Sequence, residues 1–413
     1  MTTPDAALPP VTAPCGDVRA QRRTLATCCG AHALHDGLVD MLYVLLPILA
    51  QAYGLSYAQV GLIRAANKAA MSLFQIPAGL LAESMGERNL LAFGTLCTGI
   101  AFIGLGASSG FYPILILLFI AGFGAAFQHP LCSSLVSKAY TAQRRRGGLG
   151  TYNFAGDVGK FAFAGLLSLA LAAGLSWETP VVVAGGLGVA IAVLIIIILP
   201  RLTQPPLEET TLGDAPMAPS NPGWGIRDRT GFSALCGIAV IDSATRSGFL
   251  TFIAFLMIEK GVPSGLATIA IPAVFVGGMV GKLACGFLAD RIGVIRTVVL
   301  TELATGGGIL LALVLPNLAA FALLPLIGVA LNGTSSVLYG TIGDLVDSER
   351  QSRAFGLFYT LGSVCGILAP LGYGLLGDRI GITETLAIVG AVVFLTIPLC
   401  LVLRPAIAAH SHP

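Results

Sequence analysis

Ionisable side chains lie in the middle of several long apolar segments of this sequence. In the first segment His32, Asp36 and Asp40 follow one another four residues apart, with His35 beside them. Residues four apart share one face of an α-helix. Imidazoles and carboxylates held together can bind and release protons, because histidine titrates near neutrality and a carboxylate responds to burial and to nearby charge. We therefore take Asp36 and Asp40 as the first candidates for proton coupling, followed by His32, His35 and His129.

A second group of polar residues could form a cavity together with these groups. A charge at the centre of a membrane helix costs ~2.5–3.5 kcal/mol on insertion scales and is a functional-site hypothesis by default. Single polar faces on several helices favour a shared wet cavity over exposure to lipid. The candidates for lining that cavity are Arg64, Asn67, Lys68, Gln128, Asp242, Arg246, Asn332, Ser335 and Tyr339.

Structural explanations remain open for several of these charges. Asp36 with Arg64 or Lys68 could be a fixed ion pair between the first two segments. Structural pairing is the better explanation for Asp157 and Lys160, which are three residues apart, and both readings stand for Asp242 and Arg246, which are four apart. Lys282 and Glu302 lie nearer the segment ends, and we expect them to be structural. The cations and acids nearly balance, so Arg64 and Lys68 favour an anionic solute only weakly.

The apolar segments that must position these groups dominate the chain. Of its 413 residues, 55% are hydrophobic and 11% are charged, and the mean hydropathy is +0.86. Soluble domains carry about 25% charged residues, whereas a helix that spans a ~30 Å hydrocarbon core needs ~20 mostly apolar residues. Twelve segments qualify, namely 24–50, 57–82, 89–107, 111–139, 148–173, 179–200, 230–258, 265–289, 296–315, 319–345, 353–377 and 383–403.

Charge and proline distribution predict the orientation and the division of the chain. With the N-terminus inside, most arginines fall at cytoplasmic segment ends and the other side keeps Lys260 and Arg379, which is the positive-inside pattern. Both termini are expected in the cytoplasm and the chain in the plasma membrane. The predicted parts are a tail (1–23), a six-helix bundle (24–203), a proline-rich acidic linker (204–229), a second six-helix bundle (230–403) and a tail (404–413).

Short motifs recur in the two predicted bundles at nearly the same interval. Gly79-Leu-Leu-Ala-Glu83 returns as Gly286-Phe-Leu-Ala-Asp290, 207 residues later, and Asp36 returns as Asp242 at a shift of 206. Gly156 returns as Gly362 at that same shift. Repeats of this kind predict two similar halves that enclose a site at their interface, near the bilayer midplane.

This layout resembles the major facilitator superfamily, whose Gly-x-x-x-Asp-Arg-x-Gly-x-x-Arg signature occurs between spans 2 and 3 and between spans 8 and 9. The second copy here, Gly286 to Arg296, matches fully, whereas the first has Glu83 for Asp and Ser84 for Arg. The resemblance implies an all-α membrane protein with twelve transmembrane helices in two pseudo-symmetric six-helix bundles.

The resemblance also implies a cytoplasmic latch between the halves in the outward-facing state. Asp290 would lie near the start of span 5, and Glu83 near the start of span 11. An acidic side chain there stabilises exposed helix N–H groups, and glycine permits close approach of helices. The implied latch residues are Gly79, Glu83, Gly286, Asp290, Arg291 and Gly293. A similar run, Gly374 to Gly381, falls on the outer side, and we treat it as chance.

Within the superfamily, His32-Ala-Leu-His35-Asp36-Gly and Gln128-His129-Pro130 resemble the fosmidomycin-resistance type of drug exporter. The leading hypothesis is therefore proton-coupled efflux of a drug-like or organic anionic compound. Uptake of an organic anion by proton symport and a non-transporting receptor on a carrier frame are the alternatives. No ATPase or metalloprotease motif is present. We expect a monomer in the lipid bilayer that binds a small-molecule substrate and protons, without enzyme activity, cofactor, metal or nucleic-acid partner.

Overall fold

The computed structural model describes residues 18–140, 142–199, 225–347 and 351–410. These residues are almost entirely helical, and the isolated bridge between Ile226 and Val346 is the extended pairing found among them. Most of the predicted linker and of the predicted N-terminal tail lies outside the described residues. The predicted domain boundaries therefore stay predictions.

The helices of the first half correspond to the first six predicted segments. They are α1 (Val18–Tyr53), α2 (Tyr57–Met85), α3 (Glu87–Gly106), α4 (Phe111–Ala125), α5 (Gln128–Ala139), α6 (Ala142–Ala172) and α7 (Glu178–Ile198). The predicted segment 111–139 is thus two helices, α4 and α5. Pro130 explains the interruption, because it lacks the N–H that would bond to the carbonyl group of Ala126.

The second half corresponds to the remaining six segments. It contains α8 (Arg229–Glu259), α9 (Ser264–Ala267), α10 (Ala270–Ile292), α11 (Val294–Val314), α12 (Asn317–Leu345), α13 (Gln351–Ile380), α14 (Ile382–Val392), η2 (Val393–Leu395) and α15 (Thr396–His410). Eleven helical segments in the described ranges are long and apolar enough to cross a membrane. Helix α2 is not among them, and Arg64, Asn67 and Lys68 lie in its middle.

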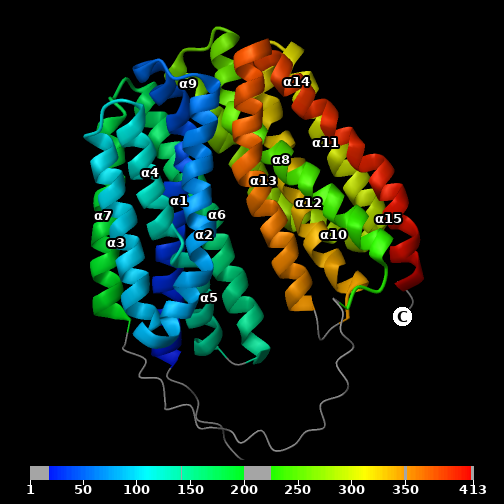
Figure 1. Ribbon diagram of the computed structural model, residues 1–413, viewed down its shortest axis with the longest axis horizontal. Coiled ribbons are helices and arrows are strands. Elements are labelled where there is room, and N and C mark those ends of the chain that lie inside the picture. The colour runs from blue at the N-terminus through cyan, green and yellow to red at the C-terminus, as the bar shows by residue number, and fades with distance from the viewer. Residues whose placement is uncertain (1–17, 141, 200–224, 348–350, 411–413) are drawn as a thin grey trace, which may run out of the picture.

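The two halves stand side by side and meet mainly at one end (Figure 1). We call it the joined end, where α2 begins and α13 finishes, and we call the opposite end, where α1 begins, the parted end. Figure 1 shows the lower parts of α5 and α6 standing apart from those of α13 and α10.

The hydrophobic core follows the same division. One core cluster contains residues of both halves, among them Leu45 of α1, Phe252 of α8 and Ile271 of α10. At the parted end each half has its own cluster, one around Leu135 and the other around Leu345. Apolar burial therefore holds the halves together at the joined end and stabilises each half separately at the parted end.

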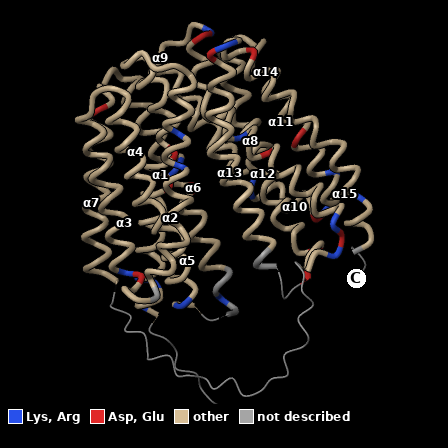
Figure 2. Tube along the Cα trace, in the orientation of Figure 1, with Lys and Arg blue, Asp and Glu red and all other residues tan. Residues whose placement is uncertain are grey.

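Charged residues lie at the two ends of the molecule and at mid-height in both halves, in a group beside α1 and α6 and at further positions near α8 and α11 (Figure 2). The rest of the trace is formed by other residues, and many large apolar side chains such as Leu318 and Ile197 are exposed on the outside. An apolar outside with charges between the helices is the arrangement expected in a bilayer.

Asp290 of the implied latch is not engaged at the parted end. The Asp290 side chain is exposed and forms no ion pair with any residue in the described ranges. The side chain of Glu83 lies outside what the structure describes. The latch role, which the resemblance assigns to the outward-facing state, stays a prediction.

Candidate functional site

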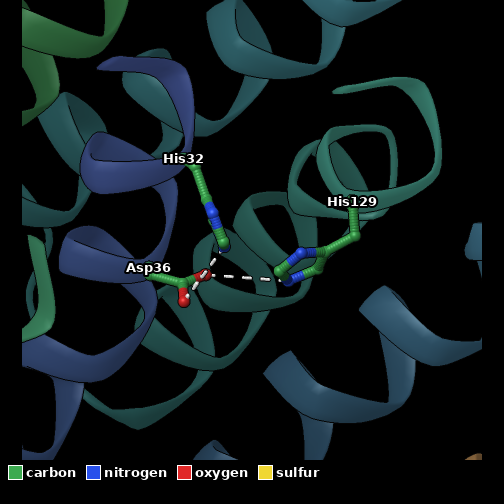
Figure 3. A group of neighbouring side chains, drawn as sticks. All are labelled: His32, Asp36 and His129. Carbon is green, nitrogen blue, oxygen red and sulfur yellow. Dashed lines mark ion pairs between the residues drawn. The ribbon is translucent and has the colours of Figure 1, made fainter. Parts of the chain in front are cut away.

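His32, Asp36 and His129 converge between α1 and the start of α5 (Figure 3). The His32 Nε2 atom lies 3.3 Å from Asp36 Oδ2, and the His129 Nε2 atom lies 3.6 Å from Asp36 Oδ1. Asp36 is only 8% exposed. The structure thus brings together three of the five residues that the sequence proposes for proton coupling, with His35 and Asp40 adjacent on α1.

His32 is held in one tautomer by the backbone. Its Nδ1–H donates to the carbonyl oxygen of Tyr152 at 2.8 Å, and its ring stacks on the Tyr152 ring at 4.1 Å between centroids. The Nε2 atom, which faces Asp36, is buried without a hydrogen-bond partner among the described residues. A glycine at position 156 makes room for this ring, because a Cβ atom there would lie 2.6 Å from His32 Nε2. The unpaired His32 Nε2 atom therefore faces the Asp36 carboxyl group.

The contacts of His35 require a proton shared with Asp36. His35 Nε2 lies 3.1 Å from the carbonyl oxygen of Ala125, which can only accept, so Nε2 carries a hydrogen. His35 Nδ1 lies 2.8 Å from Asp36 Oδ1. A bare Nδ1 facing a carboxylate would be unfavourable, so either Nδ1 also carries a hydrogen or the carboxyl group does. The pair holds one proton more than a neutral imidazole and a carboxylate.

The break between α4 and α5 positions part of this cluster. Ala125, whose carbonyl oxygen accepts the hydrogen bond from His35, is the last residue of α4. His129 is the second residue of α5. Interrupted membrane helices expose backbone groups that can bind ions or polar ligands. The break therefore supplies both a backbone acceptor and an imidazole to Asp36.

Lys160 connects the acids of α1 to those of α6. Its Nζ lies 3.2 Å from Asp36 Oδ2, 3.5 Å from Asp40 Oδ2 and 3.8 Å from Asp157 Oδ1. Arg64 pairs with Asp40 instead, at 3.2 Å. The sequence predicts that Asp36 or Asp40 meets Arg64 or Lys68, and Arg64 does pair with Asp40. The alternative of a fixed pair between Asp36 and a cation of α2 is not formed, because Asp36 pairs with Lys160 of α6.

One ion pair of the site crosses between the halves. Lys282 of α10 donates to both carboxylate oxygens of Asp157, each at 2.7 Å. Lys282, which the sequence predicts to be structural, also lines the cavity, and the pair of Asp157 with Lys160 is the longer of the two. Asp157 is therefore shared by a cation from each half.

A cavity of about 290 Å³ lies between the halves at this level. Its lining contains the cations Arg64, Lys68, Lys160, Arg246 and Lys282 and the acids Asp40 and Asp157. Four aromatic side chains, those of Tyr43, Phe275, Tyr339 and Tyr359, also line it, together with Asn332 and several serines. Five cations against two acids give the lining an excess of positive charge.

Four of the predicted cavity residues lie outside this lining. Asn67 donates to the carbonyl oxygen of Leu118, and Gln128 donates to the Tyr152 hydroxyl group. Ser335 donates to the Asn332 carbonyl oxygen of its own helix. These side chains are buried and hydrogen-bonded within one half, so polar spacing alone placed them wrongly in the cavity.

Asp242 is the fourth of these residues. It lies behind Arg246, is only 3% exposed and pairs with the Arg246 guanidinium group at 3.6 Å. Arg246 itself lines the cavity. The sequence therefore places one member of this helical pair correctly, and the other supports it from behind.

The repeat contains a signal for cavity residues that the polar stripes did not reveal. Positions 206 residues after Asp157 and Lys160 are Ser363 and Gly366, and both line the cavity. Adding 206 to the residue numbers of these polar positions of α6 would have identified both residues of α13. The same shift leads from Asn153 of α6 to Tyr359, which also lines the cavity.

The His32, Asp36 and His129 donor atoms lie within 4.8 Å of one another. Two imidazoles and a carboxylate can bind zinc and related ions. However, Asp36 already contacts the Lys160 ammonium group at 3.2 Å and His35 at 2.8 Å. A divalent ion would compete with these groups for the same carboxylate, so the donor set fits protons better than a metal, and the expected lack of a metal stays a prediction.

Two helical bundles with a charged cavity between them define a multi-pass membrane transporter. The model of the Major Facilitator Superfamily matches residues 28–239 and 235–412, and the chain belongs to this family. This confirms the predicted fold and the prediction that the chain is a transporter and not an enzyme. The finer resemblance to fosmidomycin-resistance exporters stays a prediction.

The chain is similar over most of its length to transporters with named substrates. It is 22% identical over 370 residues to a probable 4-methylmuconolactone transporter of Cupriavidus pinatubonensis, covering 89% of this chain and 86% of that one. It is 24% identical to the 4-hydroxybenzoate transporter PcaK of Pseudomonas putida, covering 81% and 79%. It is also 24% identical to the D-galactonate transporter of Escherichia coli, covering 83% and 86%.

Solved structures show the same fold. A bacterial homologue of the human lysosomal transporter Spinster, in an inward-facing and unoccupied conformation, superimposes with a TM-score of 0.72 at 16% identity, covering 96% of this chain and 97% of that one. The nucleoside transporter NupG superimposes with a TM-score of 0.70 at 14% identity, covering 95% and 100%.

Proposed function

We propose that this chain is a proton-coupled secondary transporter of small organic anions that works by alternating access. The observation that carries the proposal is the lining of the cavity, whose five cations outnumber the four acids paired with them, Asp36, Asp40, Asp157 and Asp242. Such an excess attracts an anion and disfavours a cation. The cavity volume of about 290 Å³ suits a small solute.

Lys68 is the proposed contact for the substrate carboxylate. Arg64, Lys160, Arg246 and Lys282 each have an acidic side chain within ion-pair distance. Within the described ranges Lys68 is the cavity cation that forms no such pair. Lys68 is half-buried. An ammonium group withdrawn from water without a counter-ion is costly, and an anionic solute would supply the missing charge.

The rings in the lining favour a planar or partly apolar anion. Tyr339 and Tyr359 lie 5.0 Å apart between ring centroids, and Tyr43 lies 6.5 Å from Phe275. Aromatic faces bind other rings and apolar carbon well. The relatives named for 4-hydroxybenzoate and 4-methylmuconolactone transport ring compounds, which supports this substrate class.

The proposed proton site is Asp36 with His32, His35 and His129. Lys160 is shared by three carboxylates, so a substrate anion that draws Lys160 away makes proton binding to Asp36 more favourable. The bound proton and the bound anion then each strengthen the binding of the other. Symport requires this positive linkage. We therefore favour movement of the anion together with protons.

Efflux of a drug-like compound is the second candidate. It is favoured by the convergence of the His32 to Asp36 segment with Gln128 and His129, the two motifs that resemble the fosmidomycin-resistance exporters. Exchange of substrate for protons requires that each weakens the binding of the other. Transport measured in membrane vesicles of both orientations distinguishes uptake from efflux.

We propose a monomer in the plasma membrane with both termini in the cytoplasm. The positive-inside pattern supports this orientation. The parted end, where α1 begins, would then face the cytoplasm, and this structure would be an inward-open state. The two predicted bundles, 24–203 and 230–403, are the proposed moving bodies, connected by the linker 204–229.

The test is binding of a panel of aromatic and sugar carboxylates to the purified chain, with and without Lys68→Gln. We expect one or more anions to bind, and Lys68→Gln to weaken that binding about tenfold, equivalent to ~1.4 kcal/mol. Lys138→Gln is the matched control, because Lys138 pairs with Glu87 away from the cavity. Binding of cations only, or equal weakening by both variants, would contradict the proposal.

A further inference from the structure

The end of α13 has the same local structure as the end of α10. In both places an Asp-Arg-Ile run closes the helix, a glycine with positive φ follows, and a new helix begins. The glycines are Gly293 (φ 89°) and Gly381 (φ 93°). The expectation that the run from Gly374 to Gly381 resembles the signature by chance does not account for this agreement.

Asp378 of this run binds the start of a helix in the other half. Its Oδ1 atom accepts the N–H of Tyr57 at 2.7 Å, and its Oδ2 atom accepts the N–H of Ala58 at 3.0 Å. These are the first two residues of α2, whose N–H groups have no partner within the helix. Hydrogen bonds from helix N–H groups to a carboxylate are charge-assisted and are favoured by the helix dipole.

The surrounding residues fit this contact closely. A Cβ atom at Gly374 would lie 2.3 Å from the carbonyl oxygen of Tyr57, so only glycine permits this approach. The Tyr57 hydroxyl group donates to Glu259 at 3.2 Å, and the Thr383 hydroxyl group donates to the other oxygen of Glu259 at 3.0 Å. The joined end thus contains a polar connection between α2, α8, α13 and α14.

The two Asp-Arg-Ile runs are in opposite states. Asp378 at the joined end is engaged across the halves, whereas Asp290 at the parted end is exposed without an ion pair in the described ranges. We propose that Asp378 is a latch that holds the joined end closed and must be released before this end can open. The chain then carries one such carboxylate at each end, for alternate use.

The experiment is hydrogen–deuterium exchange of the full chain in lipid nanodiscs, without substrate or proton gradient. Asp378→Asn keeps the size of the side chain and removes its charge. We expect it to speed exchange about fivefold at the start of α2, because the charge-assisted bonds favour the closed end by roughly that factor. We expect the same acceleration at 264–269, which belong to the joined end but do not contact Asp378.

The second region separates a latch from a local helix cap. If Asp378 only capped α2, exchange would rise at residues 57–61 and stay unchanged at 264–269, and that result would overturn the proposal. Unchanged exchange in both regions would overturn it as well. Asp347→Asn is the matched control, since Asp347 pairs with Arg227 within one half. Because no transport is measured, failure of the proposed function would not alter this outcome.

Discussion

Lys160 links the proton site to the contact between the halves. It lies within 3.8 Å of carboxylate oxygens of Asp36, Asp40 and Asp157, and Asp157 also binds Lys282 of the other half. If Asp36 binds a proton, Lys160 loses one of its partners and competes more strongly for Asp157. The charge of Asp36 can therefore influence an ion pair that crosses the cavity.

The first residue-scale prediction concerns Asp36. Asp36→Asn should remove proton-driven transport, because the amide cannot bind the proton that the carboxylate shares with His35. Transport in proteoliposomes as a function of pH measures this. The variant should keep its fold and still exchange substrate without a gradient. Transport by Asp36→Asn with the pH dependence of the unaltered chain would remove Asp36 from the mechanism.

The second prediction concerns the pair that crosses the cavity. Lys282→Gln and Asp157→Asn should each slow proton-driven transport, since Asp157 bridges Lys282 and Lys160. The exchanged pair Asp157→Lys with Lys282→Asp should keep substrate binding but not restore proton-driven transport. Lys160 loses one of its three acidic partners in that variant. Full recovery of proton-driven transport would show that the ion pair only holds the halves together.

At this scale the sequence predicts residue types better than partners. His32, Asp36 and His129 meet as their positions at mid-segment suggest. The sequence does not reveal the partner of Lys282, because Asp157 lies 125 residues away on another helix. Tertiary packing decides which helix lies closest to Asp36. The spacing of residues along one helix carries no information about that neighbour.

Among the elements, α6 shapes the proton site through a glycine. A Cβ atom at Gly156 would lie 2.6 Å from the His32 ring and 2.9 Å from Asp36 Oδ2. Gly156→Val should therefore displace His32, lower stability by about 1–3 kcal/mol as overpacking does, and impair proton coupling. Thermal unfolding in detergent and transport assays measure the two effects.

Gly150 is the matched control on the same helix. A Cβ atom at Gly150 would meet no atom within 4 Å, so Gly150→Val should leave proton coupling unchanged. If both variants lost coupling equally, helix propensity and not the fit around His32 would be the cause.

The sequence predicts the existence and approximate limits of the helices well, because apolar length decides them. It does not predict the breaks between α4 and α5 or between α9 and α10. Hydropathy continues through both breaks, since the interrupting residues are themselves apolar or small. Pro130 is the local feature from which the first break could have been inferred.

For the whole molecule, the internal repeat correctly predicts two similar helical bundles, and a cavity lies between them. It does not predict which end is closed. That state depends on contacts such as those of Asp378 with α2, which join residues 320 and 321 positions apart. A repeated sequence describes both states equally, and the difference between them lies in which interface is formed.

A prediction at this scale concerns Asp290. If it latches the parted end in the outward-facing state, Asp290→Asn should destabilise that state and favour the one described here. Hydrogen–deuterium exchange at the start of α2 should then slow about fivefold. The reasoning is that for Asp378, but here the substitution favours the closed joined end. Faster exchange there in Asp290→Asn would contradict a latch at the parted end.

The central claim is that an anion and a proton cross together through the cavity. The most direct measurement is the pH inside proteoliposomes after a carboxylate that binds the chain is added outside. No proton gradient is set beforehand. We predict internal acidification that depends on the anion and is absent in Asp36→Asn. Anion entry without any proton movement, or internal alkalinisation as the anion enters, would contradict the claim.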